Sequence, residues 1–393
     1  MRNGDKPDNK KNRNAHIKDA EIKSSLKLGR PPILDVDSIK TTGLTQKSDM
    51  TLKNILDYMV KSQNDIQASL YHEKKRSKSI QSLLKSLHPG YTVPHGAFFQ
   101  GLTLSGRDLK RVRFTESLFR NTKLRECALR DVIFTRCDLS GADFRKSDLT
   151  NVTFNDCNLN GADLRQCNLF NARIIDCNLF ATNLDHSTLD QTIIDNCSMK
   201  AMSLYKTSCK GTKLFNSQVV QSFLASTDMS HAEIKNMLFR DCTLNNTHFD
   251  SATLDDCCFR SCDSFEEGPI FSNSSMNNIL ITDCELDEPQ FSGTNMSNSR
   301  LDRVHINTAL FDGAIFDNVI FNKGIMTDCY SCENAPIFTK CRLDHLVIDN
   351  ADFCNANFNE SSFICTTILA SDFANWEINN SHIDEESTID TNY

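Results

Sequence analysis

The 17 cysteines are the residues of this sequence that most readily suggest chemistry. Cys329 and Cys332 have the CxxC spacing of half a zinc site, but no second pair is evident. Four others recur every 20 residues: Cys137, Cys157, Cys177 and Cys197. Thiols stacked along one axis do not converge tetrahedrally on a metal, so the spacing favours small buried thiols over a zinc site. So many free thiols also predict a reducing compartment.

Other catalytic and cofactor motifs are not found. The ten histidines are dispersed, neither GxSxG nor HExxH occurs, and no glycine-rich phosphate loop follows a predicted strand. We therefore expect no enzyme activity, no cofactor and no metal site. The function has to be sought in the surface of the fold that the rest of the chain builds.

An apolar residue recurs every five positions along most of the chain. The pattern runs without a gap through 33 units from Phe99 to Phe259, through 12 units from Phe271 to Met326, and through 10 units from Phe338 to Ile383. Two positions before most of these residues stands a small one, and 10 of the cysteines lie there. Neither a helix nor a strand repeats every five residues, so the period predicts a solenoid in which each unit is buried by its neighbours.

The units ADFRK, ADLRQ, CNLNG and SDLTN follow the pattern A-(D/N)-L-x-x and resemble the pentapeptide-repeat family. The resemblance implies an all-β solenoid, a right-handed four-sided β-helix, over residues 91–383. With four units per turn and about 4.8 Å between stacked strands, the rod would be about 65 Å long.

Two segments precede the repeats. Residues 1–48 are rich in Lys, Asn, Asp and Ser, so they cannot bury enough apolar area to offset the entropy of ordering, and we expect disorder. Residues 49–90 show helical spacing of apolar residues: Leu52, Ile55, Leu56, Met59, Ile66 and Leu70. This helical segment is expected to cap the open first turn of the solenoid, with a short coiled-coil dimer or a partner helix as alternatives.

The C-terminal end is expected to be irregular. Trp376 takes a position that elsewhere holds a small residue, and an indole there would overpack a closed turn. We therefore expect the last regular turn to end at Trp376, which would belong to a C-terminal cap. Residues 384–393 are expected to form a mobile acidic tail.

Two interruptions of the repeat resemble each other, near residues 260–270 and 327–337. FRSCDSFEEGPIF and MTDCYSCENAPIF each advance 12 positions from the first residue to the last, where two units would advance 10, and they share a Cys, a Ser, a Glu and the closing Pro-Ile-Phe. Each is expected to form a two-residue bulge at a corner. The bulges are either projecting loops that dock a partner, since solenoid insertions gather on binding faces, or an inherited duplication without a role.

Charge is distributed unevenly along the chain. Residues 1–90 carry 18 basic and 10 acidic side chains, residues 91–180 carry 13 and 10, and residues 181–393 carry 12 and 31. One end is therefore basic and the other has a net charge of −19. The acidic half resembles the duplex-DNA mimicry of those pentapeptide-repeat proteins that bind DNA gyrase or related topoisomerases. A solvated acidic surface that keeps the rod soluble is the alternative.

Positions just after the large residue should point outward, and most are polar. Several are not, among them Phe170, Ile175, Phe180, Tyr205, Phe215 and Val220. Clustered exposed apolar groups mark contact surfaces more often than single ones do, so these six are the predicted partner-binding residues. Scattered surface apolar residues are the alternative.

The function that these features favour is a non-catalytic protein–protein interaction scaffold. Its partner would be a protein of unidentified kind, or a second copy in a homodimer, and direct nucleic-acid binding is not predicted. No segment is apolar and long enough to span a bilayer, so we expect a soluble protein of the bacterial cytoplasm or an effector secreted into a host cell. The alternative function is a DNA mimic that binds gyrase or topoisomerase.

Overall fold

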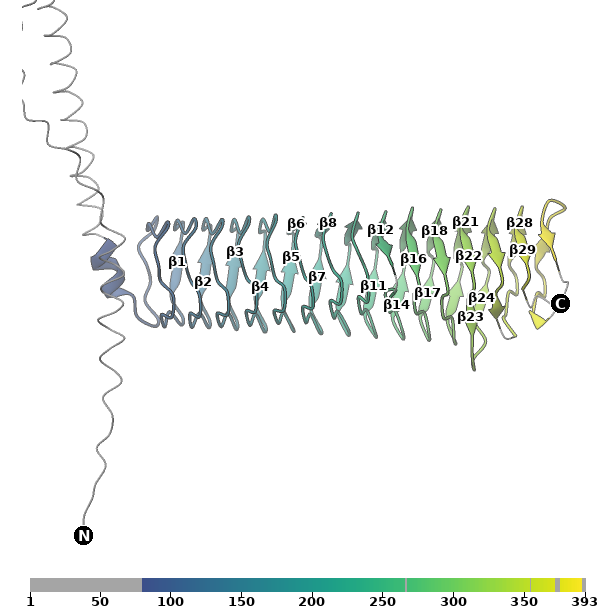
Figure 1. Cartoon of the computed structure of the whole chain (residues 1–393), viewed down its shortest axis with the longest axis horizontal. Coiled ribbons are helices and arrows are strands. Elements are labelled where there is room, and N and C mark those ends of the chain that lie inside the picture. Colours follow the sequence, from purple (N-terminus) through teal and green to yellow (C-terminus); the bar gives the residue numbers. More distant parts are fainter. Residues whose placement is uncertain (1–79, 266, 354, 372–374, 391–393) are drawn as a thin grey trace, which may run out of the picture. The chain divides into compact units, whose positions relative to one another are not determined.

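The computed structural model describes residues 80–393, except 266, 354, 372–374 and 391–393. The predicted disordered head and helical residues 49–79 lie outside the described residues. The described part is an all-β solenoid of about 14 turns, preceded by one short helix over residues 80–86 (Figure 1), and this confirms the predicted fold class. In this part of the chain, no helix has the length and apolar character needed to cross a membrane.

Each five-residue unit forms one side of a turn. In the unit that begins at Val132, Val132 and Phe134 are buried and Ile133 is partly exposed, because alternate side chains of an extended segment point to opposite sides. The last residue of the unit, Arg136, has a φ of 51° and turns the chain into the next side. This left-handed conformation repeats at corner after corner, where Asn, Asp and Gly adopt it with the least strain.

Four units complete a turn, so residues 20 apart stack in parallel register, as Phe114 does on Phe134. We number the sides faces 1 to 4 in the order in which the chain visits them. Face 1 carries a sheet of 12 strands: β1 (Arg113–Thr115), β2 (Ile133–Thr135), β3 (Thr153–Asn155), β4 (Arg173–Ile175), β5 (Ile193–Asp195), β7 (Lys213–Phe215), β9 (Glu233–Lys235), β11 (Thr253–Asp255), β14 (Ser275–Asn277), β17 (Asn295–Ser297), β20 (Ile315–Asp317) and β24 (Ile337–Thr339).

The other faces are built in the same way. Face 2 carries 10 strands: β6 (Ser198–Lys200), β8 (Gln218–Val220), β10 (Leu238–Arg240), β12 (Cys258–Arg260), β15 (Leu280–Thr282), β18 (Arg300–Asp302), β21 (Ile320–Asn322), β25 (Arg342–Asp344), β28 (Ser362–Ile364) and β30 (His382–Ile383). Face 3 carries 7 strands: β13 (Asp263–Ser264), β16 (Glu285–Asp287), β19 (His305–Asn307), β22 (Ile325–Thr327), β26 (Val347–Asp349), β29 (Thr367–Leu369) and β31 (Thr388–Ile389). Face 4 has β23 (Tyr330–Ser331) and β27 (Asp352–Phe353). Isolated bridges hold the remaining turns of faces 2 to 4.

The interior is filled by the two inward positions of each unit. Large residues stack along the axis: the ring centroids of Phe114, Phe134 and Phe154 are 5.1 and 5.2 Å apart, and their planes are within 11° and 9° of parallel. Small polar residues in the other position are satisfied by the backbone, as when Thr182 Oγ1 donates to the Leu159 carbonyl at 3.0 Å. The core therefore tolerates hydroxyls where a backbone carbonyl accepts them, although Ser274 Oγ and Ser331 Oγ are buried without a hydrogen-bond partner among the described residues.

The cysteines are part of this packing. Cys137, Cys157, Cys177 and Cys197 form one interior column, in which the Cys157 amide donates to Cys177 Sγ at 3.4 Å and the Cys177 amide donates to Cys197 Sγ at 3.5 Å. Burial raises the pKa of the separate Cys167 thiol to about 12. A thiol with a pKa raised in this way stays protonated at neutral pH.

The short helix covers the first turn. Leu83 and Leu84 pack against the hydrophobic core and Leu87 is buried within it. The guanidinium of Arg107, from the first turn, donates to the Leu84 carbonyl at 3.1 Å. The end of the predicted helical segment thus occupies the place expected of a cap.

The prediction that the last regular turn ends at Trp376 is wrong. Trp376 is buried, and its ring stacks on Phe358 at 4.8 Å with an angle of 28° between the planes. The parallel ladder continues beyond it, because β30 pairs with β28 and β31 pairs with β29. The indole also packs against Phe353, whose ring centroid lies 5.6 Å from it. Strand β31 also gives part of the predicted mobile tail a regular structure.

The two interruptions lie at different corners. Ser264 of face 3 and Phe271 of face 4 flank the first insertion, residues 265–270, while Ser331 of face 4 and Phe338 of face 1 flank the second, residues 332–337. Each insertion adds two residues to a stacking interval, so that Leu254 pairs with Met276, 22 positions on. Because the first insertion enters face 4 and the second leaves it, the two border opposite edges of that face. Figure 1 shows the loop after β23 extending beyond the neighbouring turns.

Candidate interaction surface

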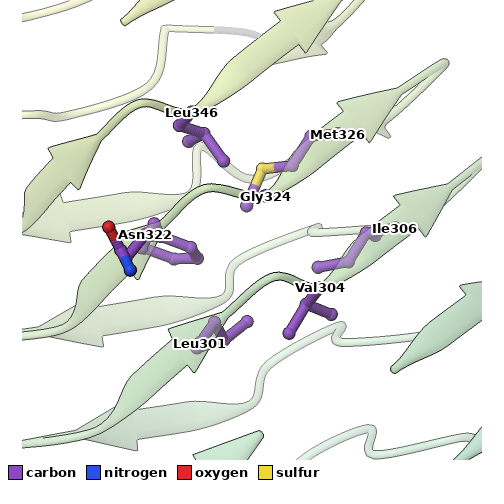
Figure 2. Close-up of a pocket in the computed structure, with 8 residues that line it drawn as sticks. Leu301, Val304, Ile306, Asn322, Gly324, Met326 and Leu346 are labelled. Carbon is purple, nitrogen blue, oxygen red and sulfur yellow. The ribbon is translucent and has the colours of Figure 1, made fainter. Parts of the chain in front are cut away.

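The interior of the described turns contains a small cavity. A cavity of about 10 Å³ lies beside Gly324, with room for about one water molecule. Leu346 and Met326 lie on either side of Gly324 in Figure 2. A Cβ at position 324 would stand 3.2 Å from Leu346 Cδ1, so the glycine makes room for an unusually large residue at a small inward position. The cavity is a packing defect with an apolar lining.

One group of potential metal ligands occurs among the described residues, at the C-terminal end. Cys365, Asp384 and Glu386 place one ligand atom each within 4.8 Å of the others. The Cys365 thiol donates to Glu386 Oε2 at 2.8 Å, and this hydrogen bond raises the pKa of the thiol to about 11. The group is therefore a hydrogen-bonded corner with a protonated thiol. The CxxC pair is not brought together for binding, since Cys329 is buried and Cys332 is exposed.

The six predicted partner-binding residues spread over all four faces. Face 1 has Ile175 and Phe215, face 2 has Phe180 and Val220, face 3 has Tyr205, and face 4 has Phe170. Ile175 and Phe215 share a face as expected, with Asp195 between them in the stack. The six do not form one continuous surface.

Val220 is not an exposed residue, which corrects the prediction. It is only 4% exposed, whereas Phe170 and Phe180 are 45% and 40% exposed. The register places Val220 between Lys200 and Arg240. The alkyl stems of long basic side chains can cover an apolar neighbour while their charges stay in water.

Tyr205 belongs to an aromatic group that the sequence analysis did not assemble. Its ring centroid lies 5.8 Å from that of Phe223 and 5.6 Å from that of His186, and Lys206 Nζ lies 5.0 Å from it. Phe223 is 43% exposed. We call His186, Tyr205, Lys206 and Phe223 the aromatic patch of face 3. It joins an apolar surface to a cation–π pair, a combination suited to protein contacts.

Phe223 was missed because only the position after the large residue was inspected. The position before it also points outward, since side chains alternate along an extended segment. The same reasoning would have found Tyr330, which precedes Ser331 and is 40% exposed. Phe265 was missed because it stands inside an interruption, where the five-residue frame gave no orientation; its side chain is 55% exposed.

The basic half of the rod neutralises its own charges on face 3. Arg145 Nε lies 3.2 Å from Asp163, Arg165 lies 2.7 Å from the same carboxylate, and Arg125 pairs with Asp143. These acids occupy the Asp or Asn position that the repeat itself favours. Because these carboxylates pair with arginines of the same face, they contribute little to an acidic field.

The acids beside the first insertion are different. Among the described residues, none of five acids there has an ion-pair partner within 4.0 Å: Asp263, Glu267, Glu285, Asp287 and Glu288. Asp263 and Glu285 are direct neighbours in the register of β13 and β16. Burial, with the Glu285 charge as a smaller cause, raises the pKa of Asp263. The sequence has no Lys or Arg between Arg260 and Arg300 to compensate them.

The second insertion is held by a carboxylate. Asp312 Oδ1 accepts the amides of Glu333 and Asn334, each at 2.7 Å, and Asp312 Oδ2 accepts the Asn334 side chain at 3.1 Å. These backbone hydrogen bonds hold the pKa of Asp312 below its ordinary value. A lowered pKa means that the stabilisation is complete above the ordinary carboxyl pKa and is lost as the pH falls through the value in the folded protein.

Replacing Asp312 with alanine should loosen the second insertion. We expect the Glu333 and Asn334 amides to exchange with solvent about tenfold faster at neutral pH, since hydrogen bonds to a charged acceptor are among the stronger ones. The difference from the unmodified protein should shrink as the pH falls below the ordinary carboxyl pKa and vanish once the Asp312 carboxylate is protonated in the folded protein. Asp352→Ala, an exposed acid on the same face, is the control. Equal exchange in the unmodified protein and Asp312→Ala would contradict this role.

A family model matches part of the chain. The model describes a pentapeptide repeat region, and it matches residues 95–164 and 147–224. A comparison with curated protein sequences found no match. The matched residues include the aromatic patch of face 3 and precede both insertions.

Several solved structures are similar to this chain. Trypsin-treated QnrB1, a plasmid-mediated fluoroquinolone resistance protein, is 19% identical over 48% of this chain and 92% of its own, with a TM-score of 0.41. HetL from Nostoc sp. strain PCC 7120, a pentapeptide repeat protein involved in heterocyst differentiation regulation, is 17% identical over 53% and 87%, with a TM-score of 0.22. The A-module of the Azotobacter vinelandii mannuronan C-5 epimerase AlgE6 is 9% identical over 77% and 89%, with a TM-score of 0.35.

Proposed function

Because the chain belongs to the pentapeptide-repeat family, whose solenoid presents only its outer faces, we propose that it is a non-catalytic scaffold that binds a protein partner. The observation that carries the proposal is the aromatic patch of face 3. Exposed aromatic side chains that contact one another on an otherwise polar rod are typical of protein–protein contact surfaces.

A binding role fits the chemistry of the rod better than catalysis does. Burial raises the pKa of the Cys167 thiol to about 12, the apolar cavity beside Gly324 has room for about one water molecule, and the hydrogen bond to Glu386 raises the pKa of the Cys365 thiol to about 11. Tyrosine and phenylalanine, by contrast, are enriched at the centres of protein interfaces, where burying them contributes most of the affinity.

The proposal includes a reducing location, either the bacterial cytoplasm or a host cell into which the protein is secreted as an effector. The free thiols of the described residues support it, because a chain with this many cysteines would be exposed to mispairing in an oxidising compartment. The basic, polar composition of residues 1–48 is consistent with a segment used for delivery or docking.

The test is affinity capture from bacterial and host-cell lysates with the intact chain and two single variants. Phe223→Asp places a charge in the aromatic patch, and Thr253→Asp places the same charge on face 1. We expect one protein to be captured by the intact chain and by Thr253→Asp and to be lost with Phe223→Asp, while circular dichroism shows that both variants stay folded. Capture of the same protein by the Phe223→Asp variant would refute the aromatic patch as the binding surface.

The unpaired acids beside the first insertion support a second candidate, a DNA mimic that binds gyrase or topoisomerase. Asp283 is not a good residue for testing it, since its carboxylate lies 2.6 Å from Arg303. Neutralising Glu285, Asp287 and Glu288 is the sharper change. Capture of a topoisomerase subunit that is lost with this triple variant and kept with Phe223→Asp would favour the DNA mimic over the scaffold.

A further inference from the structure

Phe265 stands at the start of the first insertion, in the middle of the unpaired acids. It follows Ser264, whose register partner is Leu286, so Phe265 and Asp287 lie in the same outward column. Its carbonyl accepts the Glu267 amide at 3.0 Å and the Asn245 side chain, which fix the backbone below the ring. The ring itself is 55% exposed. An exposed aromatic ring on a fixed backbone, with acids at neighbouring outward positions, is a surface that attracts cationic side chains.

The backbone of the insertion is packed tightly against the acids. Gly268 lies so close to β16 that a Cβ on it would stand 2.2 Å from the Asp287 carbonyl oxygen. Ser264 Oγ, at the large inward position, accepts the Asp287 amide at 3.0 Å. Asp287 Oδ1 in turn accepts the Asn307 side chain at 2.6 Å. The Asp287 side chain, which is next to Phe265 in the register, is thus held in place by the fold.

The second insertion repeats the combination at the opposite edge of face 4. Tyr330 is 40% exposed and stands between Leu310 and Asp352 in the outward column, and Glu333 is exposed in the loop that Asp312 fixes. Three steps of about 4.8 Å separate the two insertions along the rod, or about 14 Å. An extended segment of about five residues spans that length.

We infer that the edge of faces 3 and 4 around Phe265, extending across face 4 to Tyr330, binds an arginine- or lysine-rich extended segment of a protein. The choice of occupant follows from charge: five acids of the surface have no ion-pair partner in the part of the chain that the structure describes, and the 39 residues between Arg260 and Arg300 contain no Lys or Arg. A guanidinium or ammonium group would lie over the Phe265 ring, and the carboxylates of Glu285 and Asp287 would accept its hydrogen bonds. The inference rests on the proposed role of the rod as a binding scaffold.

The test is fluorescence anisotropy with fluorescein-labelled nona-arginine and the full chain. We expect saturable binding whose Kd rises about tenfold in Phe265→Ala and again in the double variant Glu285→Gln with Asp287→Asn, and rises less in Tyr330→Ala. Two matched controls should leave the Kd unchanged: Phe170→Ala removes an exposed ring on an earlier turn, and Glu360→Gln removes one negative charge from face 1.

Each outcome decides the matter. Binding that weakens equally in Glu285→Gln with Asp287→Asn and in Glu360→Gln would overturn the inference, because it would show attraction to net charge alone. Absence of saturable binding would overturn it too. Since Phe223 lies outside this surface, the two failures can be told apart. Lysate capture that survives Phe223→Asp, with nona-arginine binding as expected, shows that the proposed function has failed. Capture that is lost in Phe223→Asp, without saturable nona-arginine binding, shows that this inference has failed.

Discussion

Replacing Phe338 with alanine is expected to lower the free energy of unfolding by about 3–5 kcal/mol, because the cavity cannot collapse between stacked turns. The Phe338 ring is fully buried, with centroids 4.9 Å from Phe316 and 4.5 Å from Phe358. It also contacts Phe311, Phe321 and Phe353, at centroid distances between 5.8 and 6.1 Å. No other replacement of a single ring would remove so many aromatic contacts at once.

Chemical denaturation with amide exchange is the measurement. Because each turn of a solenoid contacts only its neighbours, the turns around Phe338 should open before those near the N-terminus. Phe170→Ala, which removes an exposed ring, should change the stability by less than about 0.5 kcal/mol. Equal losses in the two variants would show that burial in the core does not set the stability of the rod.

The second large effect is expected from Gly268→Ala. A Cβ there would lie 2.2 Å from the Asp287 carbonyl oxygen and 2.5 Å from the Glu288 carbonyl carbon. Both neighbours are backbone atoms of or next to β16, so neither can move aside without shifting the strand. We expect a loss of about 3 kcal/mol in the free energy of unfolding, at the upper end of the usual range for overpacking. Nona-arginine binding should be lost with it.

Gly161→Ala separates this steric effect from backbone strain. Gly161 has a φ of 64° and no atom within 4 Å of an added Cβ, so alanine there meets strain alone. We expect a loss of about 1 kcal/mol, measured by the same denaturation. If Gly161→Ala is as damaging as Gly268→Ala, the close approach of the first insertion to β16 is not what requires the glycine.

The five-residue period specifies most of the fold because it encodes burial directly. The period predicts that large residues such as Phe134 and small ones such as Cys157 are both buried in the interior. Four units per turn then predict that Cys137 stacks on Cys157, 20 residues on. The structure of the end of the rod was not predicted correctly from the period. Trp376 appeared too large for a closed turn, but the sequence does not reveal how far the last turn is enclosed.

The candidate surface was only partly predictable. Tyr205 was found because it follows a large residue. Phe223 stands before a large residue, and its contact with Tyr205 on the neighbouring turn is seen only in the structure. Val220 shows the limit of the approach, because its burial depends on the long side chains above and below it. The insertions were recognised as a pair, but the corner that each occupies depends on counting faces through the 22-residue intervals.

The most direct test of the scaffold proposal is hydroxyl-radical footprinting of the intact chain, alone and with the captured partner. Side-chain oxidation of Tyr205 and Phe223 should fall when the partner is bound, while Phe170, on face 4 of an earlier turn, keeps its reactivity. Unchanged oxidation of Tyr205 and Phe223 in a stable complex would contradict the proposal that this protein acts through the aromatic patch of face 3.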